Sequence, residues 1–196
     1  MTPMLTSHIG VRGLFLRAAE AAPSELSGNM LQHVCGMYPQ QDRLAGDVDC
    51  EVDQLPLAND SLNLAFVQHG LEQNPRWPLL IEEIARCLQP EGVLMLTVFS
   101  RFSLWRSRWP RGTLLPIDRL AVVRSCESAG LTVEERLAIG PLWPLPLTDQ
   151  LGSESLSFGP CHTSWALVLR KRRPGMTPIG MRRNVVFNAN ANARPT

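Results

Sequence analysis

Residues 78–99 read PLLIEEIARCLQPEGVLMLTVF, a helix pattern followed by a strand pattern. In the first half, five apolar residues recur at helical spacing: Leu80, Ile81, Ile84, Ala85 and Leu88. The turn residues 90–92 (PEG) follow, and residues 93–99 (VLMLTVF) are then apolar at nearly every position. A strand that is apolar on both sides belongs inside a covered parallel sheet. The stretch therefore predicts a helix over 78–88 and a central strand over 93–99.

Further elements are predicted on both sides of this stretch. Upstream, loose helical spacing after Ser7 predicts a helix over 8–22, and short apolar runs predict strands over 30–35 and 62–67 and an extended piece over 50–55. Downstream, the pattern predicts a helix over 117–128, strands over 131–139 and 164–169, and a proline-rich loop over 140–160. Helices that alternate with strands predict an α/β fold with a mostly parallel sheet, which binds ligands at the carboxyl ends of its strands.

Length and composition favour one domain. The chain has 196 residues, of which 44% are hydrophobic and 19% charged. We expect this domain to cover residues 1–173, because residues 174–196 have almost no periodicity and end in a repeated Asn-Ala pattern typical of disorder. A net charge of +1 argues against nucleic acid or an anionic membrane as a bulk electrostatic partner.

Other sequence signals concern location and metals. No apolar run approaches the roughly 18 residues that cross a membrane, and the N-terminus lacks a signal-peptide pattern, so a cytoplasmic location is expected. The five cysteines are scattered and include no C-x-x-C pair. This spacing predicts neither a disulfide framework nor a metal site.

Four motifs occur in order between Glu51 and Trp105: LPLANDSL (55–62), HGLE (69–72), EIARCLQPEG (83–92) and VLMLTVFS (93–100). The series resembles the type 11 branch of class I S-adenosylmethionine (SAM) methyltransferases, and in particular the small methyltransferase-like proteins encoded beside glyoxalase II in proteobacteria. The resemblance extends over about residues 9–173. It implies a Rossmann-like sheet with helices on both faces, SAM as the cofactor and a small molecule as the methyl acceptor.

The resemblance also implies site residues. Glu51, five places before Pro56, matches the acid that contacts adenine, and the segment 68–72 matches the wall of the cofactor pocket. The implied cofactor-binding residues are Gly36, Glu51, Asp53, Gln68 and Gly70. His69 is the candidate catalytic residue, since an imidazole can move a proton near neutral pH, although a lone histidine is also commonly structural.

Two departures from the family pattern concern the cofactor loop. The family carries a glycine-rich turn after its first strand, whereas residues 30–39 (MLQHVCGMYP) hold only Gly36. The interval from Met30 to Val52 is also shorter than the roughly 30 residues of a βαβ unit, so the first such unit is predicted to be shortened. Asp47 or Asp49 is left as the candidate for the ribose hydroxyls.

Three hypotheses follow from these observations. The first is a SAM-dependent methyltransferase. The second is a binding or regulatory module of methyltransferase fold that has lost SAM and works through a protein partner. The third is an RNA-associated protein that uses the cationic segments 100–111 and 170–173, against which the low net charge argues.

Overall fold

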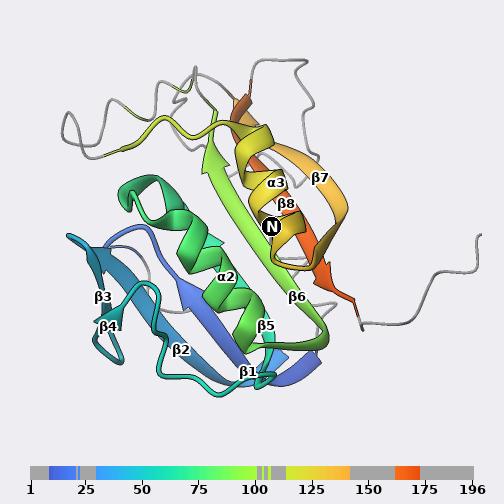
Figure 1. Ribbon diagram of the computed structural model, residues 1–196. Coiled ribbons are helices and arrows are strands. Elements are labelled where there is room, and N and C mark those ends of the chain that lie inside the picture. The colour runs from blue at the N-terminus through green and yellow to red at the C-terminus, as the bar shows by residue number, and fades with distance from the viewer. Residues whose placement is uncertain are drawn as a thin grey trace, which may run out of the picture.

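A computed structural model describes residues 9–20, 22, 30–100, 103, 106, 114–141 and 162–172. These residues form one eight-stranded sheet in the order β4-β3-β2-β1-β5-β6-β8-β7 (Figure 1). The strands are β1 (Ile9–Leu16), β2 (Met30–Gln40), β3 (Arg43–Gly46), β4 (Cys50–Glu51), β5 (Leu62–Gln68), β6 (Leu88–Phe99), β7 (Leu131–Pro141) and β8 (His162–Lys171). The helices are η1 (Leu71–Gln73), α2 (Trp77–Cys87) and α3 (Arg119–Ser128).

The centre of the sheet is parallel and its flanks are antiparallel. Strands β2, β1, β5 and β6 run parallel to one another, whereas β3 and β4 on one flank and β8 and β7 on the other pair antiparallel. The α/β class is therefore confirmed, and the expected parallel arrangement holds for the four central strands. The sheet ends at the two-residue strand β4 and at β7, whose ladder with β8 shifts register between Val133 and Glu135.

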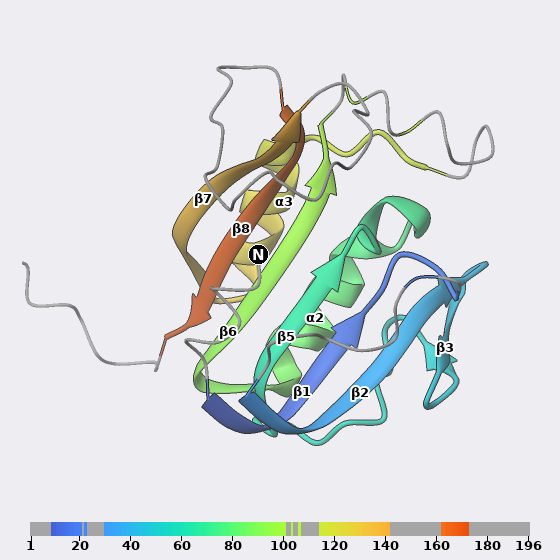
Figure 2. The ribbon, with the colours of Figure 1, turned by 180° about the vertical axis from the view of Figure 1, so that it is seen from behind.

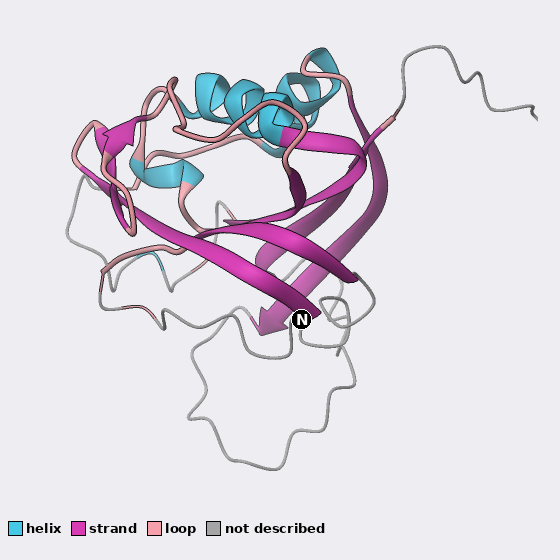
Figure 3. Cartoon of the chain, turned by 90° about the horizontal axis from the view of Figure 1, so that it is seen from below, coloured by secondary structure: helices cyan, strands magenta, loops and turns pink. Residues whose placement is uncertain are grey.

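Helices α2 and α3 lie on the same face of the sheet, as Figures 1, 2 and 3 show from three directions. The larger core lies between these helices and the sheet, and it includes Leu16, Leu80 and Leu96. A smaller core lies on the opposite face, where the rings of Phe15 and Phe66 stack with their centroids 5.5 Å apart. Helices were expected on both faces, whereas the described helices α2 and α3 cover one face.

The segment predicted as a helix over 8–22 is instead the central strand β1. Two glycines explain the difference, because glycine weakens a helix and allows a close approach between strands. A Cβ on Gly13 would lie 2.4 Å from Leu31 Cδ1, and one on Gly10 would lie 2.5 Å from Asn63 Cβ. The Asn63 side chain also accepts hydrogen bonds from two backbone N–H groups of β1.

This correction moves the first crossover of the fold. The strand predicted over 30–35 is confirmed as the first part of β2, which makes it the second strand along the chain. Gly36 therefore lies inside β2, opposite Phe15 in the ladder, and not in a turn after the first strand. The connection from β1 to β2 runs over residues 17–29, close to the dozen residues that a parallel crossover requires.

The remaining predictions of single elements are largely confirmed. The helices over 78–88 and 117–128 correspond to α2 and α3, and the later apolar runs correspond to β5, β6, β7 and β8. Strand β4 falls within the extended piece predicted over 50–55, whereas β3 was not predicted. Most of the loop predicted over 140–160 and all of the tail over 174–196 lie outside the described residues.

The described residues include four free cysteines and no group of side chains that could hold a metal ion. No described helix combines the length and the apolar character needed to span a membrane.

Candidate functional site

Polar residues gather at the carboxyl edge of the parallel strands. Arg17 follows β1, Tyr38 lies near the end of β2, His69 follows β5 and Ser100 follows β6. The ladders place the ends of β1, β2 and β5 side by side, since Leu16 pairs with both Met37 and Val67. In open α/β sheets this edge is where ligands bind.

His69 is held in a defined position at this edge. Its backbone has a φ of 51°, in the left-handed region, and its N–H donates to the carbonyl of Thr97 on β6. The imidazole stacks on the ring of Phe99 with centroids 3.8 Å apart and planes inclined by 13°. Its Nδ1 atom lies 3.6 Å from Glu72 Oε1. The ring is therefore fixed by a stacking contact and faces a carboxylate.

Glu72 is fully buried, which is costly for a carboxylate unless other groups bind it. Its Oε1 atom accepts a hydrogen bond from the Phe99 backbone N–H at 2.6 Å. Its backbone carbonyl accepts another from Leu115 N–H, also at 2.6 Å. Glu72 thus joins the segment after β5 to the end of β6 and to the residues that precede α3.

The described residues contain six buried side-chain polar atoms without a hydrogen-bond partner: Arg17 Nε, His69 Nδ1, Glu72 Oε2, Asn74 Nδ2, Thr97 Oγ1 and Ser103 Oγ. All six belong to residues near or just beyond the carboxyl ends of β1, β5 and β6. Buried polar groups are nearly always satisfied, and exceptions call for an explanation. The clustering of these atoms at one edge is what a site for a polar ligand would produce.

The loop after β1 has a distinct set of donors. The Arg17 guanidinium lies over the Tyr38 ring, 5.1 Å from its centroid, and donates to the carbonyl of Ala22 at 3.1 Å. The next three backbone N–H groups, those of Ala18, Ala19 and Glu20, make no hydrogen bond with any other described residue. Successive N–H groups that are available beside a cation favour an anionic group.

The predicted residues Glu51 and Asp53 lie together on the flank of β4. The Arg76 guanidinium is 3.0 Å from Glu51 Oε2 and 3.7 Å from Asp53 Oδ2. Arg43 Nε lies 3.2 Å from the other oxygen of Glu51. Both carboxylates therefore already have cationic partners.

Gly36 is separated from the other predicted residues by its place inside β2. Its N–H donates to the carboxylate of Asp47 at 2.7 Å, so that carboxylate closes the β2–β3 hairpin. Gln68 and Gly70, by contrast, flank His69 at the carboxyl edge. A Cβ on Gly70 would lie 2.9 Å from Leu16 Cδ2, so this position requires the close approach that glycine permits.

Arg17 and Tyr38 were missed by the sequence analysis. One signal could have located Arg17. Gly10 and Gly13, followed by the apolar run 14–16, mark a strand that ends directly before Arg17.

Comparison with known proteins is consistent with this arrangement. The family model described as a methyltransferase domain matches residues 10–96, from the start of β1 into β6. No curated protein matches the chain. Among solved structures, a putative methyltransferase from Bacillus halodurans matches with a TM-score of 0.62 and 12% identity, over 88% of this chain and 97% of its own.

Two further structures agree. The [4+2]-cyclase SpnF matches with a TM-score of 0.58 and 15% identity, over 87% of this chain and 79% of its own. A methyltransferase structure from Haloferax volcanii, in complex with the activator Trm112, matches with a TM-score of 0.56 and 13% identity, over 90% and 88% of the two chains. The chain therefore shares the fold of these structures. Within this fold, β1 occupies the first-strand position, and the loop that begins at Arg17 follows it.

Proposed function

We propose that the protein is a SAM-dependent methyltransferase with a small-molecule acceptor, and that SAM binds at the carboxyl edge of β1, β2 and β5. The observation that supports this most is the cluster of unsatisfied buried polar atoms at that edge. Four of the six residues that carry them lie after β1 or after β5, inside the segment that resembles the methyltransferase domain family.

The loop after β1 fits the carboxylate end of SAM. Ala18 and Ala19 have the smallest side chains after glycine, and the N–H groups of residues 18–20, which make no hydrogen bond within the described part of the chain, follow one another directly. The cation of Arg17 adds a positive charge to this loop. These features supply, without glycine, the backbone donors and positive potential that an anionic group needs.

The ribose end of the proposed site departs from the family pattern. Asp47 is used by Gly36, and the carboxylates of Glu51 and Asp53 are paired with Arg76. Among the described residues near the end of β2, the carboxylates of Asp42 and Asp49 remain without an ion-pair partner, so Asp49 stays the candidate for the ribose hydroxyls. Glu51 could contact adenine only while it is also paired with arginine.

When bound, SAM supplies a methyl group already activated by a sulfonium. The chain's part is to align the acceptor and to keep water away, and such alignment alone can account for a large rate increase. Leu16, Leu71 and Phe99 give the edge a buried apolar lining. His69, fixed by Phe99 and facing Glu72, is placed to accept a proton from an acceptor that must lose one.

The pairing of Glu51 and Asp53 with Arg76 favours a second candidate, a methyltransferase-fold module that has lost SAM and works through a protein partner. The similar Haloferax volcanii structure is itself a complex with an activator protein. The two candidates differ in one measurable property, the affinity for the cofactor.

The experiment is calorimetric titration of the full chain with S-adenosylhomocysteine. The first candidate predicts a dissociation constant in the micromolar range, about 8 kcal/mol of binding free energy. Ala19→Asp places a negative charge in the half-buried loop after β1 and should weaken binding by about tenfold or more. Ala138→Asp makes the same change on the exposed face of β7 and should leave binding unchanged. No binding up to about 1 mM would exclude the first candidate and favour the second.

A further inference from the structure

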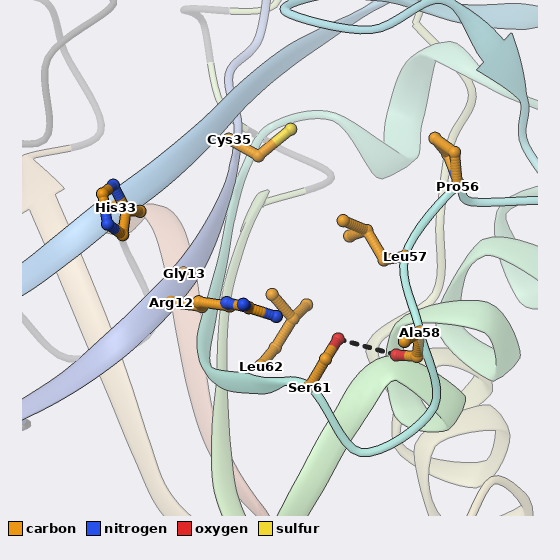
Figure 4. A pocket seen from close by; sticks show the side chains of 9 residues that line it. All are labelled: Arg12, Gly13, His33, Cys35, Pro56, Leu57, Ala58, Ser61 and Leu62. Carbon is orange, nitrogen blue, oxygen red and sulfur yellow. Dashed lines mark hydrogen bonds between the residues drawn. The ribbon is translucent and has the colours of Figure 1, made fainter.

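A cavity lies away from the carboxyl edge, on the sheet face that carries α2. Its volume is about 250 Å³. It lies between the paired strands β1 and β2 on one side and the connection before β5 on the other. Its nine lining residues are Arg12, Gly13, His33, Cys35, Pro56, Leu57, Ala58, Ser61 and Leu62 (Figure 4). Arg12 precedes the end of β1 by four residues, about 13 Å along the strand, so this cavity is separate from the proposed SAM site.

The connection between β4 and β5 accounts for the cavity. Residues 52–61 cross from the flank of the sheet to β5 without forming a helix. A crossover helix would cover the sheet at this point, whereas an extended connection covers it only in part. The connection is fixed by Arg86 of α2, which donates to the carbonyls of Leu55 and Leu57 at 3.0 Å each. The cavity is therefore bounded by anchored backbone.

The walls combine an apolar surface with an unpaired cation. Leu57 and Leu62 supply apolar surface, and Figure 4 shows the Arg12 side chain and the Cys35 thiol directed into the space beside them. The Arg12 guanidinium makes no hydrogen bond or ion pair with the described residues. His33 lies at the margin and adds a second nitrogen-bearing side chain.

Negative charge is scarce in the lining. None of the nine lining residues carries a carboxylate. Burial, together with the nearby Asp47, raises the pKa of the Cys35 thiol, so this group stays neutral at neutral pH. The Asp47 carboxylate is itself bonded to Gly36 N–H. An anion in the cavity would thus meet a permanent cation without a competing lining carboxylate.

We propose that this cavity binds a small organic anion, with the anionic group on Arg12 and an apolar body of about the size of a phenyl ring against Leu57 and Leu62. The volume lies just below the usual range of small-molecule sites, which limits the ligand to about one ring and its head group. A guanidinium pairs with carboxylate or phosphate oxygens through two parallel hydrogen bonds, so both anion types belong to the class.

The test is a titration of the ¹⁵N-labelled full chain followed by amide chemical shifts. The probes are benzoate, phenyl phosphate and, as a neutral analogue of benzoate, benzamide. We expect benzoate or phenyl phosphate to shift the amides of Gly13, Leu57 and Ser61 with a millimolar dissociation constant, and benzamide to bind at least about tenfold more weakly. The choice between the two anions identifies the preferred head group.

Arg12→Gln should weaken anion binding by about tenfold or more, because a charge-assisted pair is lost. Arg124→Gln removes the same charge from the exposed face of α3 and should leave binding unchanged. Ala58→Trp, at an exposed position of the lining, should fill the cavity and abolish binding of both anions. Equal binding of benzamide and benzoate, equal effects of the two arginine variants, or no shift with either anion would overturn the proposal. The result does not depend on SAM binding.

Discussion

At the scale of single residues, burial and pairing explain the chemistry of several side chains. Glu72 combines complete burial with one bonded oxygen and one unsatisfied oxygen. Removing a buried acceptor leaves its donor unpaired, which costs more than a typical hydrogen bond contributes.

We predict that Glu72→Ala lowers the free energy of unfolding by about 2–3 kcal/mol, because Phe99 N–H loses its acceptor. Glu72→Gln keeps an acceptor oxygen, so its free energy of unfolding should fall clearly less. Urea denaturation of the three proteins, followed by circular dichroism, measures the difference. Equal losses in both variants would show that the charge of Glu72 matters more than its hydrogen bond.

The Cys126 thiol on α3 offers a second prediction at this scale. Burial raises its pKa to about 12, so almost none is thiolate at pH 8. Iodoacetamide should leave Cys126 unmodified in the native protein and alkylate it in concentrated urea, as read by peptide mass mapping. Rapid modification of the native protein would mean that α3 opens readily.

At the scale of elements, the contact between α2 and residues 55–59 depends on Glu83 and Arg86. The Glu83 carboxylate accepts from Arg86 Nη2 at 2.8 Å and from Leu55 N–H at 3.1 Å. Arg86 also donates to the side chain of Asn59. One ion pair on the helix thus fixes the connection that bounds the cavity beside Arg12.

The hydrogen bonds from Arg86 lower the pKa of Glu83 below the ordinary value of 4.5 for a glutamate. A lowered folded-state pKa stabilises the protein above the unfolded-state pKa, and this stabilisation is lost as the pH falls through the folded-state value. Glu83→Gln should therefore reduce the free energy of unfolding by about 1–2 kcal/mol at pH 7. Urea titrations at successive pH values should show this difference shrinking below about pH 4.5. A difference that does not change with pH would contradict the ion-pair explanation.

The β2–β3 hairpin depends on Gly46, which has a φ of 143°. A Cβ there would lie 2.3 Å from the carbonyl oxygen of Gly36. Gly46→Ala should cost about 3–5 kcal/mol, since backbone strain adds to a clash with backbone. Gly130→Ala is the matched control, because its φ is 81° but no atom lies within 4 Å of its Cβ, so only about 1–2 kcal/mol should be lost. Thermal melting ranks the two variants, and similar losses would contradict the close contact.

Sequence patterns predicted the elements whose side chains form strong repeats. The apolar face of α2 and the continuous apolar run of β6 are such cases. Strand β1 escaped prediction because Gly10, Arg12 and Gly13 interrupt its apolar pattern, and the reason for the glycines lies in contacts with Leu31 and Asn63, far along the chain. The short strand β3 likewise depends on pairing that no local pattern reveals, whereas β4 falls within the extended piece predicted over 50–55.

In the candidate site, too, residues beside a clear sequence pattern were predicted, and residues that depend on distant contacts were not. The segment 68–72 could be located because it follows a clear strand, and the structure brings Gln68, His69 and Gly70 to the carboxyl edge. Gly36 was assigned to the cofactor loop only because the first strand had been placed at residue 30. The donors of the loop after β1 became visible once β1 itself was known. Whether these residues bind SAM stays a prediction.

At the scale of the whole molecule, the last described strand is inserted between two earlier strands of the sheet. Strand β8 lies between β6 and β7 and contributes the buried side chains of Trp165, Leu167 and Leu169. Lys171 Nζ also lies 2.7 Å from Asp60 Oδ1, which joins the end of β8 to the residues before β5.

Two truncations test the expected domain of residues 1–173. A chain that ends at Arg173 should unfold at the same urea concentration as the full chain, because all eight strands are retained. A chain that ends at Cys161 should show no cooperative transition, because β6 loses its neighbour and β7 its only partner. A large loss of stability in the longer truncation would show that residues 174–196 contribute to the fold.

The two ends of the sheet have a consequence for how the protein behaves among its own copies. An exposed strand edge invites a neighbouring chain to continue the ladder, which leads to aggregation. Here one end is a strand of only two residues, and the other is interrupted by a register shift beside the charged Glu134, Glu135 and Arg136. An incoming strand would find too few hydrogen bonds at the first end and charged side chains at the second. At high concentration, this protein should therefore not aggregate by pairing its strand edges with those of other copies.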